Sequence, residues 1–212
     1  MNKDLLNNKK NIFWDFDGVV KDSVEIKSNA YEELFLQWGV CVSNKVRDHH
    51  GLNGGMSRFD KIPLYLSWTD EDINKKLIDK LCNDFSILVK HKVINSPWVP
   101  GVVDLIDHIG SIGHASYIVT ATPQSEITEI LHELKLHSSF KEIIGAPINK
   151  SDAIKSIIDK YKISKKSSIM IGDSKTDMIA AKNNHIDFIL RKTNENTALQ
   201  IGLSSQMVDN FL

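Results

Sequence analysis

Two aspartates separated by a single residue follow the first apolar run of the chain, in the segment "IFWDFDGVVKDS". Asp15 and Asp17 would repel each other, so this spacing is unfavourable unless a cation offsets their charge. On an extended backbone, side chains two residues apart point to the same side. The segment therefore predicts two carboxylates that act together on a cation or a reacting group.

Further polar residues follow apolar, strand-like runs later in the chain. They are, in order, Thr120 after "SYIV", Lys150 in the segment after "FKEIIGA", and Asp173 with Asp177 after "SSIMIG". The carboxyl ends of parallel strands lie along one edge of an open α/β sheet, where such folds bind ligands. We therefore expect these side chains to converge with the first two aspartates.

Such a set of side chains is suited to phosphoryl transfer. Carboxylates such as Asp15 and Asp173 are hard oxygen donors that suit magnesium, and magnesium attracts phosphate. Lys150 would offset the remaining negative charge, and the hydroxyl of Thr120 would donate a hydrogen bond to a phosphoryl oxygen. Asp15 is the expected nucleophile that forms an aspartyl-phosphate, and Asp17 the expected acid and base.

Strand-like and helical segments alternate around these residues. Apolar runs predict strands at 11–15, 115–121, 140–146, 167–173 and 187–191, and helical patterns separate the later ones. Strands joined by helical crossovers form a parallel sheet with helices on both faces. The predicted fold class is therefore α/β, with a Rossmann-like core, and residues 194–212 are expected to form a short helical or irregular closing segment.

Residues 23–94 interrupt this alternation, because every pattern in them is helical. Apolar residues recur at helical spacing in "VEIKSNAYEELFLQW" up to a stop at Gly39, and again in "KIPLYLSW" and over 69–94. In the last segment Thr69 is the predicted N-cap, with Glu71 and Asp72 in the first turn. We therefore predict an α-helical cap domain over 23–94, inserted into a core domain of residues 1–22 and 95–212.

Composition indicates an ordinary globular protein. The 212 residues are 42% hydrophobic and carry a formal net charge of −1. Nothing in this balance indicates nucleic acid or an anionic membrane as a partner, and no apolar run is long enough to span a bilayer. Cys41 and Cys82 lack metal-ligand spacing and are expected to be reduced, among helices. The expected location is cytoplasmic.

Four segments resemble, in order and spacing, the motifs of the haloacid dehalogenase superfamily, and the resemblance covers essentially the whole chain. They are "DFDGVVKDS", "IVTAT", "NKSDAI" and "GDSKTDM". The resemblance implies a phosphatase with Mg²⁺ as cofactor and a small phosphorylated metabolite as partner. It assigns the roles already described to Asp15 and Asp17 and makes Thr120 and Lys150 ligands of the transferring phosphate.

The same resemblance implies a full set of magnesium ligands. Asp173 is expected to bind the ion, with Asp177 supporting it from nearby. The side chain of Asp15 and the backbone carbonyl of Asp17 are expected to be the remaining protein ligands of the ion. Gly18 and Ala121, within the first two motifs, are expected substrate contacts.

The helical insert resembles the small cap of phosphoglycolate phosphatases and β-phosphoglucomutases. Its segment "GMSR" is similar to the cap loop of β-phosphoglucomutase-like proteins, which implies that Ser57 and Arg58 face the substrate. Lys27 stands where those mutases have a histidine that assists proton transfer, and a lysine there is a phosphate ligand rather than a proton shuttle. His49 and His50 are predicted to lie in a loop.

The favoured activity is magnesium-dependent hydrolysis of a small phosphate monoester, with a slight preference for a sugar phosphate. A sugar phosphomutase and a non-enzymatic protein that binds a phosphorylated ligand are the alternatives. A dehalogenase is disfavoured because it has no use for Asp17. A phosphonatase needs a Schiff-base lysine, a role open to Lys21 and Lys27. The expected oligomeric state is a monomer or a weak homodimer.

Overall fold

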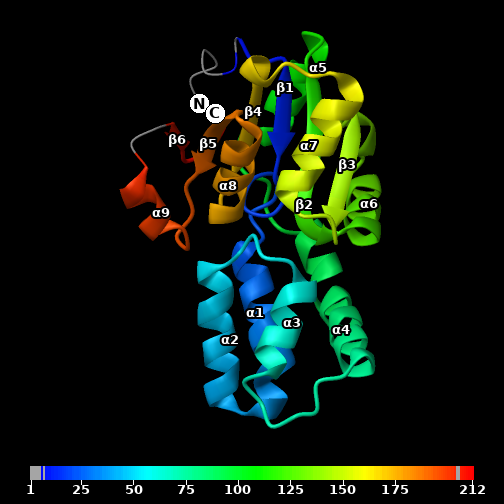
Figure 1. Cartoon of the computed structure of the whole chain (residues 1–212), viewed down its shortest axis with the longest axis vertical. Coiled ribbons are helices and arrows are strands. Elements are labelled where there is room, and N and C mark those ends of the chain that lie inside the picture. The colour runs from blue at the N-terminus through cyan, green and yellow to red at the C-terminus, as the bar shows by residue number, and fades with distance from the viewer. Residues whose placement is uncertain (1–5, 7, 204–205) are drawn as a thin grey trace.

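The structure is a computed structural model that describes residue 6 and residues 8–203 and 206–212. Within these residues, six strands form one sheet in the order β3-β2-β1-β4-β5-β6, and each strand is parallel to its neighbours (Figure 1). The strands are β1 (Asn11–Trp14), β2 (Ala115–Pro123), β3 (Glu142–Ala146), β4 (Ser168–Gly172), β5 (Asp187–Arg191) and β6 (Met207–Val208). The predicted α/β class with a Rossmann-like sheet is confirmed.

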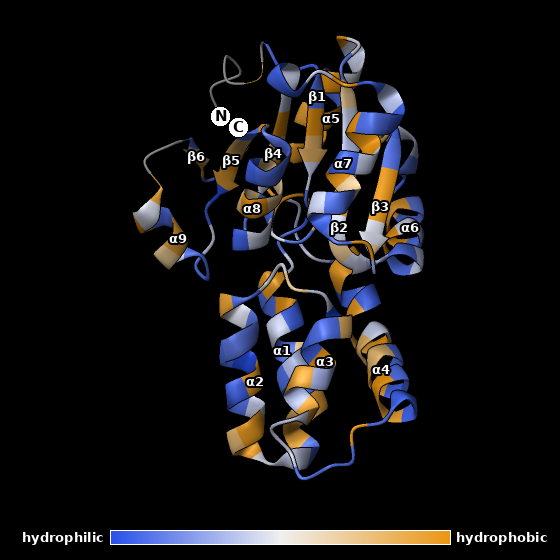
Figure 2. Cartoon of the chain, in the orientation of Figure 1, coloured by the Kyte–Doolittle hydropathy of each residue, from blue (hydrophilic) through white to orange (hydrophobic). Residues whose placement is uncertain are grey.

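Helices cover both faces of this sheet because the strands are apolar on both sides. Along β1, Ile12 and Trp14 are buried in one apolar cluster and Phe13 is buried in another. Figure 2 shows β1 and β5 largely in the orange of apolar residues, as expected for a sheet buried on both faces. The helices that supply the first cluster are α5 (Val102–Ser111) and α6 (Gln124–Glu133), and those that supply the second are α7 (Lys150–Tyr161) and α8 (Lys175–Asn184).

Every regular element within residues 23–94 is a helix, as predicted, and this part of the chain lies below the sheet in Figure 1. Its rings form much of its own core: Tyr31 stacks on Phe85 with 3.9 Å between ring centroids, and both side chains are buried. The elements are α1 (Val24–Phe35), the 3₁₀ helix η2 (Leu36–Trp38), α2 (Val40–Leu52), α3 (Arg58–Leu66) and α4 (Lys75–Ile94).

The chain passes between the two parts at neighbouring points. The N–H of Asp22 donates to the carbonyl of Pro97 at 2.9 Å, so the outgoing and returning segments lie side by side. We therefore propose the sequence-based division as the domain structure. Residues 23–94 are called the cap, and residues 1–22 and 95–212, of which 1–5, 7, 204 and 205 lie outside the described part, are called the core.

The predicted start of the longest cap helix is wrong. Helix α4 begins at Lys75, and its N-cap is Asn74, whose side chain accepts a hydrogen bond from the N–H of Leu77 at 3.0 Å. The hydroxyl of Thr69 instead donates to the carbonyl of Leu66 at 2.7 Å, beyond the end of α3. Glu71 and Asp72 therefore precede the helix, because Asn74 is an equally good cap that lies closer to the first apolar turn.

The predicted loop position of His49 and His50 is also wrong, since both lie in α2. The buried positions of this helix are Ser43, Val46 and His50, which have helical spacing. Two of the three are polar, so an apolar pattern does not reveal the helix.

The closing segment contains α9 (Thr197–Gly202) and β6, and residues 204 and 205 between them lie outside the described part. Cys41 and Cys82 lie in α2 and α4, and both are free thiols, as predicted. In the described ranges, no helix combines the length and apolar character needed to cross a bilayer.

Candidate active site

Three carboxylates converge at the carboxyl edge of the sheet. Asp15 follows β1 and Asp173 follows β4, and these two strands are neighbours in the sheet. Asp177 lies in the first turn of α8. Each of the three offers a carboxylate oxygen, and these oxygens all lie within 4.8 Å of one another. The structure thus brings together residues that are up to 162 positions apart in the sequence.

Lys150, the first residue of α7, links two of these carboxylates. Its Nζ lies 2.6 Å from Oδ2 of Asp15 and 2.7 Å from Oδ1 of Asp177, and all three side chains are buried. Burial alone would lower the pKa of Lys150, but the two carboxylates outweigh it and raise the pKa. Asp177 also caps α8, because its Oδ2 accepts the N–H of Ser174 at 3.1 Å.

One ammonium does not balance three carboxylates. Burial raises the pKa of Asp15 to about 7 despite the ion pair with Lys150. Burial, followed by the charges of Asp15 and Asp177, raises the pKa of Asp173 well above its usual range. A divalent cation would relieve this repulsion, and a set of hard carboxylate oxygens is suited to Mg²⁺.

Gly18 lets the first motif pass close to this cluster. Its φ is +75°, and a Cβ atom there would lie 2.2 Å from Oδ2 of Asp173. Any side chain at this position would displace the carboxylate, so glycine is required by both the backbone conformation and the space.

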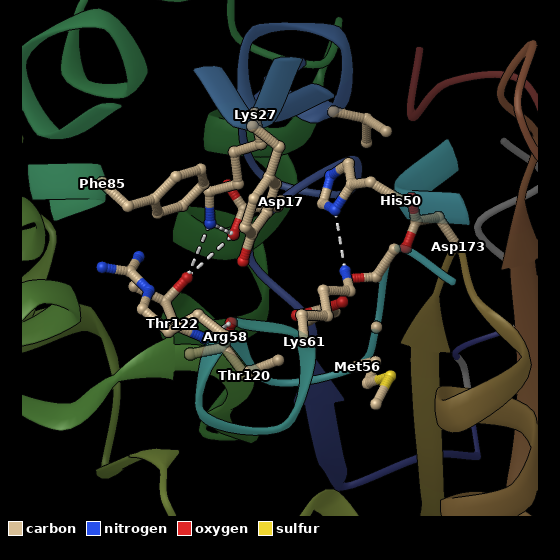
Figure 3. A pocket seen from close by; sticks show the side chains of 16 residues that line it. Asp17, Lys27, His50, Met56, Arg58, Lys61, Phe85, Thr120, Thr122 and Asp173 are labelled. Carbon is tan, nitrogen blue, oxygen red and sulfur yellow. Dashed lines mark hydrogen bonds and ion pairs between the residues drawn. The ribbon is translucent and has the colours of Figure 1, made fainter. Parts of the chain in front are cut away.

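Asp17 is surrounded by hydrogen-bond donors. Thr122 donates to its Oδ2 at 2.9 Å, and Lys27 forms an ion pair with Oδ2 (Figure 3). Ser23 donates to its Oδ1 at 2.6 Å. Burial would raise the pKa of Asp17, but the charge and hydrogen bond of Lys27 and the two hydroxyls hold it below its usual value. Asp17 is therefore ionised in this arrangement.

The end of β2 supplies the next wall of the site. Thr120 is buried, and its Oγ1 accepts the N–H of Thr122 at 3.2 Å. The motif "IVTAT" drew attention to Thr120, but the contact of Thr122 with Asp17 was missed. The available signal was that Thr122 lies two residues after Thr120, the same spacing that places Asp15 and Asp17 on one side of the backbone. Ser23, also missed, stands at the end of the first motif.

Arg58, in the first turn of α3, forms an ion pair with the core. Its guanidinium donates to both carboxylate oxygens of Glu126 on α6, at 2.8 and 2.7 Å, and lies over the ring of Phe85. Both charged side chains are about 95% buried. Glu126 was missed because nothing in the helical segment around it marks it. Ser57 is the N-cap of α3 and accepts the N–H of Phe59.

The loop between α2 and α3 rests directly on the core. The hydroxyl of Thr176 donates to the carbonyl of Gly55 at 3.2 Å. A Cβ atom at Gly55 would lie 1.9 Å from Oγ1 of Thr176, so only glycine permits this approach. The cap is therefore closed over the carboxylates.

A cavity of about 40 Å³ lies between cap and core in this arrangement. Lys27, His50, Arg58 and Lys61 are its basic cap residues (Figure 3). From the core it is lined by Asp15, Asp17, Thr120, Ala121, Thr122 and Asp173.

Not every predicted substrate contact lines this cavity. Ala121, Lys27 and Arg58 do, whereas Gly18 and Ser57 do not. The latter two therefore stay predictions.

Sequence reasoning missed two further residues of the cavity, Lys61 and His50. Nζ of Lys61 lies 2.8 Å from Nδ1 of His50, and both side chains are buried. Lys61 stands three residues after Arg58 on α3, so helical spacing from that arginine was the available signal.

Comparison with known proteins agrees with this fold. The family described as "Haloacid dehalogenase-like hydrolase" matches residues 12–191. The chain is 27% identical over 184 residues to phosphoglycolate phosphatase of Vibrio parahaemolyticus, covering 82% of this chain and 79% of that protein. It is 23% identical over 176 residues to a phosphoglycolate phosphatase of Pseudomonas putida, covering 81% of this chain and 65% of that protein.

Solved structures show the same fold at lower identity. CbbY from Rhodobacter sphaeroides, in complex with phosphate, has a TM-score of 0.76 at 15% identity, over 96% of this chain and 95% of that chain. A haloacid dehalogenase-like family hydrolase from Streptococcus pneumoniae has a TM-score of 0.71 at 21% identity, over 94% of this chain and 93% of that chain. The parallel α/β sheet and the carboxylate cluster at its edge agree with the class of hydrolases that the sequence match indicates. The chain belongs to the haloacid dehalogenase-like hydrolases.

Proposed function

We propose that this hydrolase is a magnesium-dependent phosphatase that cleaves a small phosphate monoester through an aspartyl-phosphate. One observation carries the proposal: Asp15 lines a closed cavity and contacts Lys150, with Asp173 and Asp177 within reach of a shared cation. Asp17 lines the same cavity, so a nucleophile and an acid or base face one substrate.

In the first step, an oxygen of Asp15 attacks phosphorus and the bond to the leaving oxygen breaks. Lys150 holds the Asp15 carboxylate by its Oδ2, while the backbone N–H of Phe16 donates to Oδ1 at 2.7 Å. Thr120 and Ala121 line the cavity at the end of β2, where a hydroxyl and a backbone N–H can hold the phosphoryl group.

Asp17 serves the leaving oxygen and then the attacking water. A protonated Asp17 gives its proton to the leaving oxygen, and the resulting carboxylate removes a proton from the water that hydrolyses the aspartyl-phosphate. The ion pair with Lys27 favours the carboxylate, which is the form that the second step needs. To act as an acid, Asp17 must take up a proton as Lys27 moves away from it or is neutralised by the substrate.

Magnesium fits the carboxylate cluster and would be held by Asp15, Asp173 and Asp177, with the Asp17 carbonyl as the predicted further ligand. When bound, the ion would offset the charge of the phosphoryl group as it approaches three carboxylates.

The substrate is proposed to be small. The cavity between cap and core has only about 40 Å³ in this arrangement, which disfavours a large leaving group. The relatives from Vibrio and Pseudomonas are phosphoglycolate phosphatases, which makes a two-carbon phosphate ester the first candidate. The preference for a sugar phosphate, the cytoplasmic location and the monomeric or weakly dimeric state stay predictions.

Among the alternatives, the structure offers nothing that favours a mutase or a non-enzymatic ligand-binding protein over a phosphatase. For a phosphonatase, Lys27 is paired with Asp17, and Lys21 lies over the ring of Trp98 and donates to the carbonyl of Ile94 at 3.0 Å. Neither lysine is presented to the cavity as a free amine.

The test is phosphate release from a panel of phosphate esters with Mg²⁺. Asp15→Asn should abolish turnover, and Asp17→Asn should slow it by about 10²- to 10⁴-fold, because a nucleophile and an acid–base group are lost. Asp107→Asn, a change at an exposed position of α5, is the matched control and should leave the rate unchanged. Substantial turnover by Asp15→Asn would refute the aspartyl-phosphate.

A further inference from the structure

Three cationic side chains of the cap line the cavity, and two of them are already neutralised by carboxylates. Lys27 forms an ion pair with Asp17, and Arg58 forms one with Glu126. Lys61 is the third, and in the described part of the chain no carboxylate lies within ion-pair distance of it. Its charge therefore lacks a counter-ion.

The contacts of Lys61 leave one donor for a ligand. Its side chain is only 1% exposed. Nζ lies 2.8 Å from Nδ1 of His50 and donates to the carbonyl of Gly54 at 3.3 Å. Nζ also lies 5.6 Å from the centroid of the Tyr31 ring. An ammonium has three N–H donors, so one is left without a hydrogen-bond acceptor after His50 and Gly54 are served.

Burying a lysine without a counter-ion is unfavourable for folding. Burial, together with the charges of Lys27, Lys150 and Arg58, lowers the pKa of the Lys61 ammonium well below its usual value. An anion that enters the cavity would remove this cost. A buried ammonium with no carboxylate beside it, on the wall of a substrate cavity, is accordingly better explained by binding than by stability.

We propose that Lys61 binds a second anionic group of the substrate and so selects phosphate esters that carry one. This inference rests on the proposed phosphatase function. The phosphoryl group occupies the core end of the cavity, at Asp15 and Thr120, and the second group occupies the cap end, at Lys61 and His50. The small volume of the closed cavity favours a carboxylate over a second phosphate as that group.

Three esters of the same two-carbon skeleton separate these cases. They are 2-phosphoglycolate, ethylene glycol bisphosphate and 2-hydroxyethyl phosphate, which carry a carboxylate, a phosphate and a neutral hydroxyl opposite the scissile phosphate. A charge-assisted contact with Lys61 should favour 2-phosphoglycolate over 2-hydroxyethyl phosphate by roughly 10- to 100-fold in kcat/KM. A larger preference for the bisphosphate would identify phosphate as the second group, and no preference for either anion would overturn the inference.

Variants of Lys61 assign the preference to this residue. Lys61→Met should remove the 10- to 100-fold preference by lowering kcat/KM for 2-phosphoglycolate more than kcat/KM for 2-hydroxyethyl phosphate, and Lys61→Arg should restore part of it. Lys61→Gln keeps a donor without the charge and serves if the methionine variant does not fold. Lys76→Met, at an exposed position of α4, is the matched control. Equal losses with charged and neutral esters would overturn the inference, because they indicate a structural role.

Binding keeps this test separate from that of the proposed function. If the wild-type protein releases phosphate from none of the esters, the phosphatase proposal fails. Isothermal titration of 2-phosphoglycolate and 2-hydroxyethyl phosphate into Asp15→Asn, with and without Lys61→Met, then decides the role of Lys61. Tighter binding of the charged ester that disappears with Lys61→Met supports the inference, and equal binding of both esters refutes it.

Discussion

At the scale of single residues, the contact between Lys27 and Asp17 distinguishes this site. The ammonium of Lys27 pairs with Oδ2 of Asp17 and also donates to Oγ1 of Thr122 at 2.9 Å. Lys27 is held on α1 of the cap, whereas the other two residues belong to the core. The ionisation of the acid–base carboxylate is thus linked to the position of the cap.

Removing this ammonium should change the pH dependence of turnover. In Lys27→Met, burial would no longer be outweighed by a neighbouring cation, so the pKa of Asp17 should rise. Because the hydrolysis step needs ionised Asp17, the acidic limb of the kcat–pH profile should move to higher pH, while Lys27→Arg should keep it near the wild-type position. An unchanged limb in Lys27→Met would show that Lys27 does not set the ionisation of Asp17.

At the scale of elements, the ion pair of Arg58 and Glu126 joins α3 of the cap to α6 of the core. Both side chains are about 95% buried, and the contact is bidentate. Arg58 was predicted to bind substrate, but its guanidinium is occupied by the Glu126 carboxylate. This predicted specificity residue thus also joins the cap to the core.

Truncating Arg58 should destabilise the protein. Arg58→Ala leaves the Glu126 carboxylate buried without its partner, which should lower the free energy of unfolding by about 3–5 kcal/mol. Arg47→Ala is the matched control, because it breaks the half-exposed pair with Glu32 and should cost at most about 1 kcal/mol. Urea unfolding measures both. Equal, small losses would show that the buried pair does not stabilise the closed arrangement.

The core site was predictable because its residues lie at strand ends or in the first turn of the helix that follows a strand. A parallel sheet brings Asp15, Thr120 and Asp173 to one edge whatever the details of packing. The cap lacks such a rule. Its contacts with the core depend on how helices pack, which is why Glu126 went unnoticed and why His50, on a helix with polar buried positions, was assigned to a loop.

At the scale of the whole molecule, the site unites segments from both parts of the chain. The carboxylates lie on the core together with Lys150, further cationic side chains line the cavity from the cap, and the loop at Gly55 contacts Thr176 directly. Opening of the cap would separate Lys27 from Asp17 and Arg58 from Glu126. Substrate entry and the charge balance of the cavity are therefore coupled.

Magnesium should stabilise the folded protein as a whole. The ion binds the carboxylate cluster only when Asp15, Asp173 and Asp177 are brought together, so it favours the native state by mass action, by about 2.7 kcal/mol at a hundredfold excess over its Kd. The melting temperature should therefore rise with Mg²⁺ concentration and fall again on chelation.

Asp173→Asn separates this effect from a general influence of salt. The variant loses a ligand, so its melting temperature should no longer respond to Mg²⁺. In the absence of the ion it should be more stable than wild type, because burial and the charges of Asp15 and Asp177 disfavour ionised Asp173. Asp107→Asn should keep the wild-type response. An equal Mg²⁺ response in all three proteins would place the ion elsewhere and remove the carboxylate cluster from the proposed catalytic site.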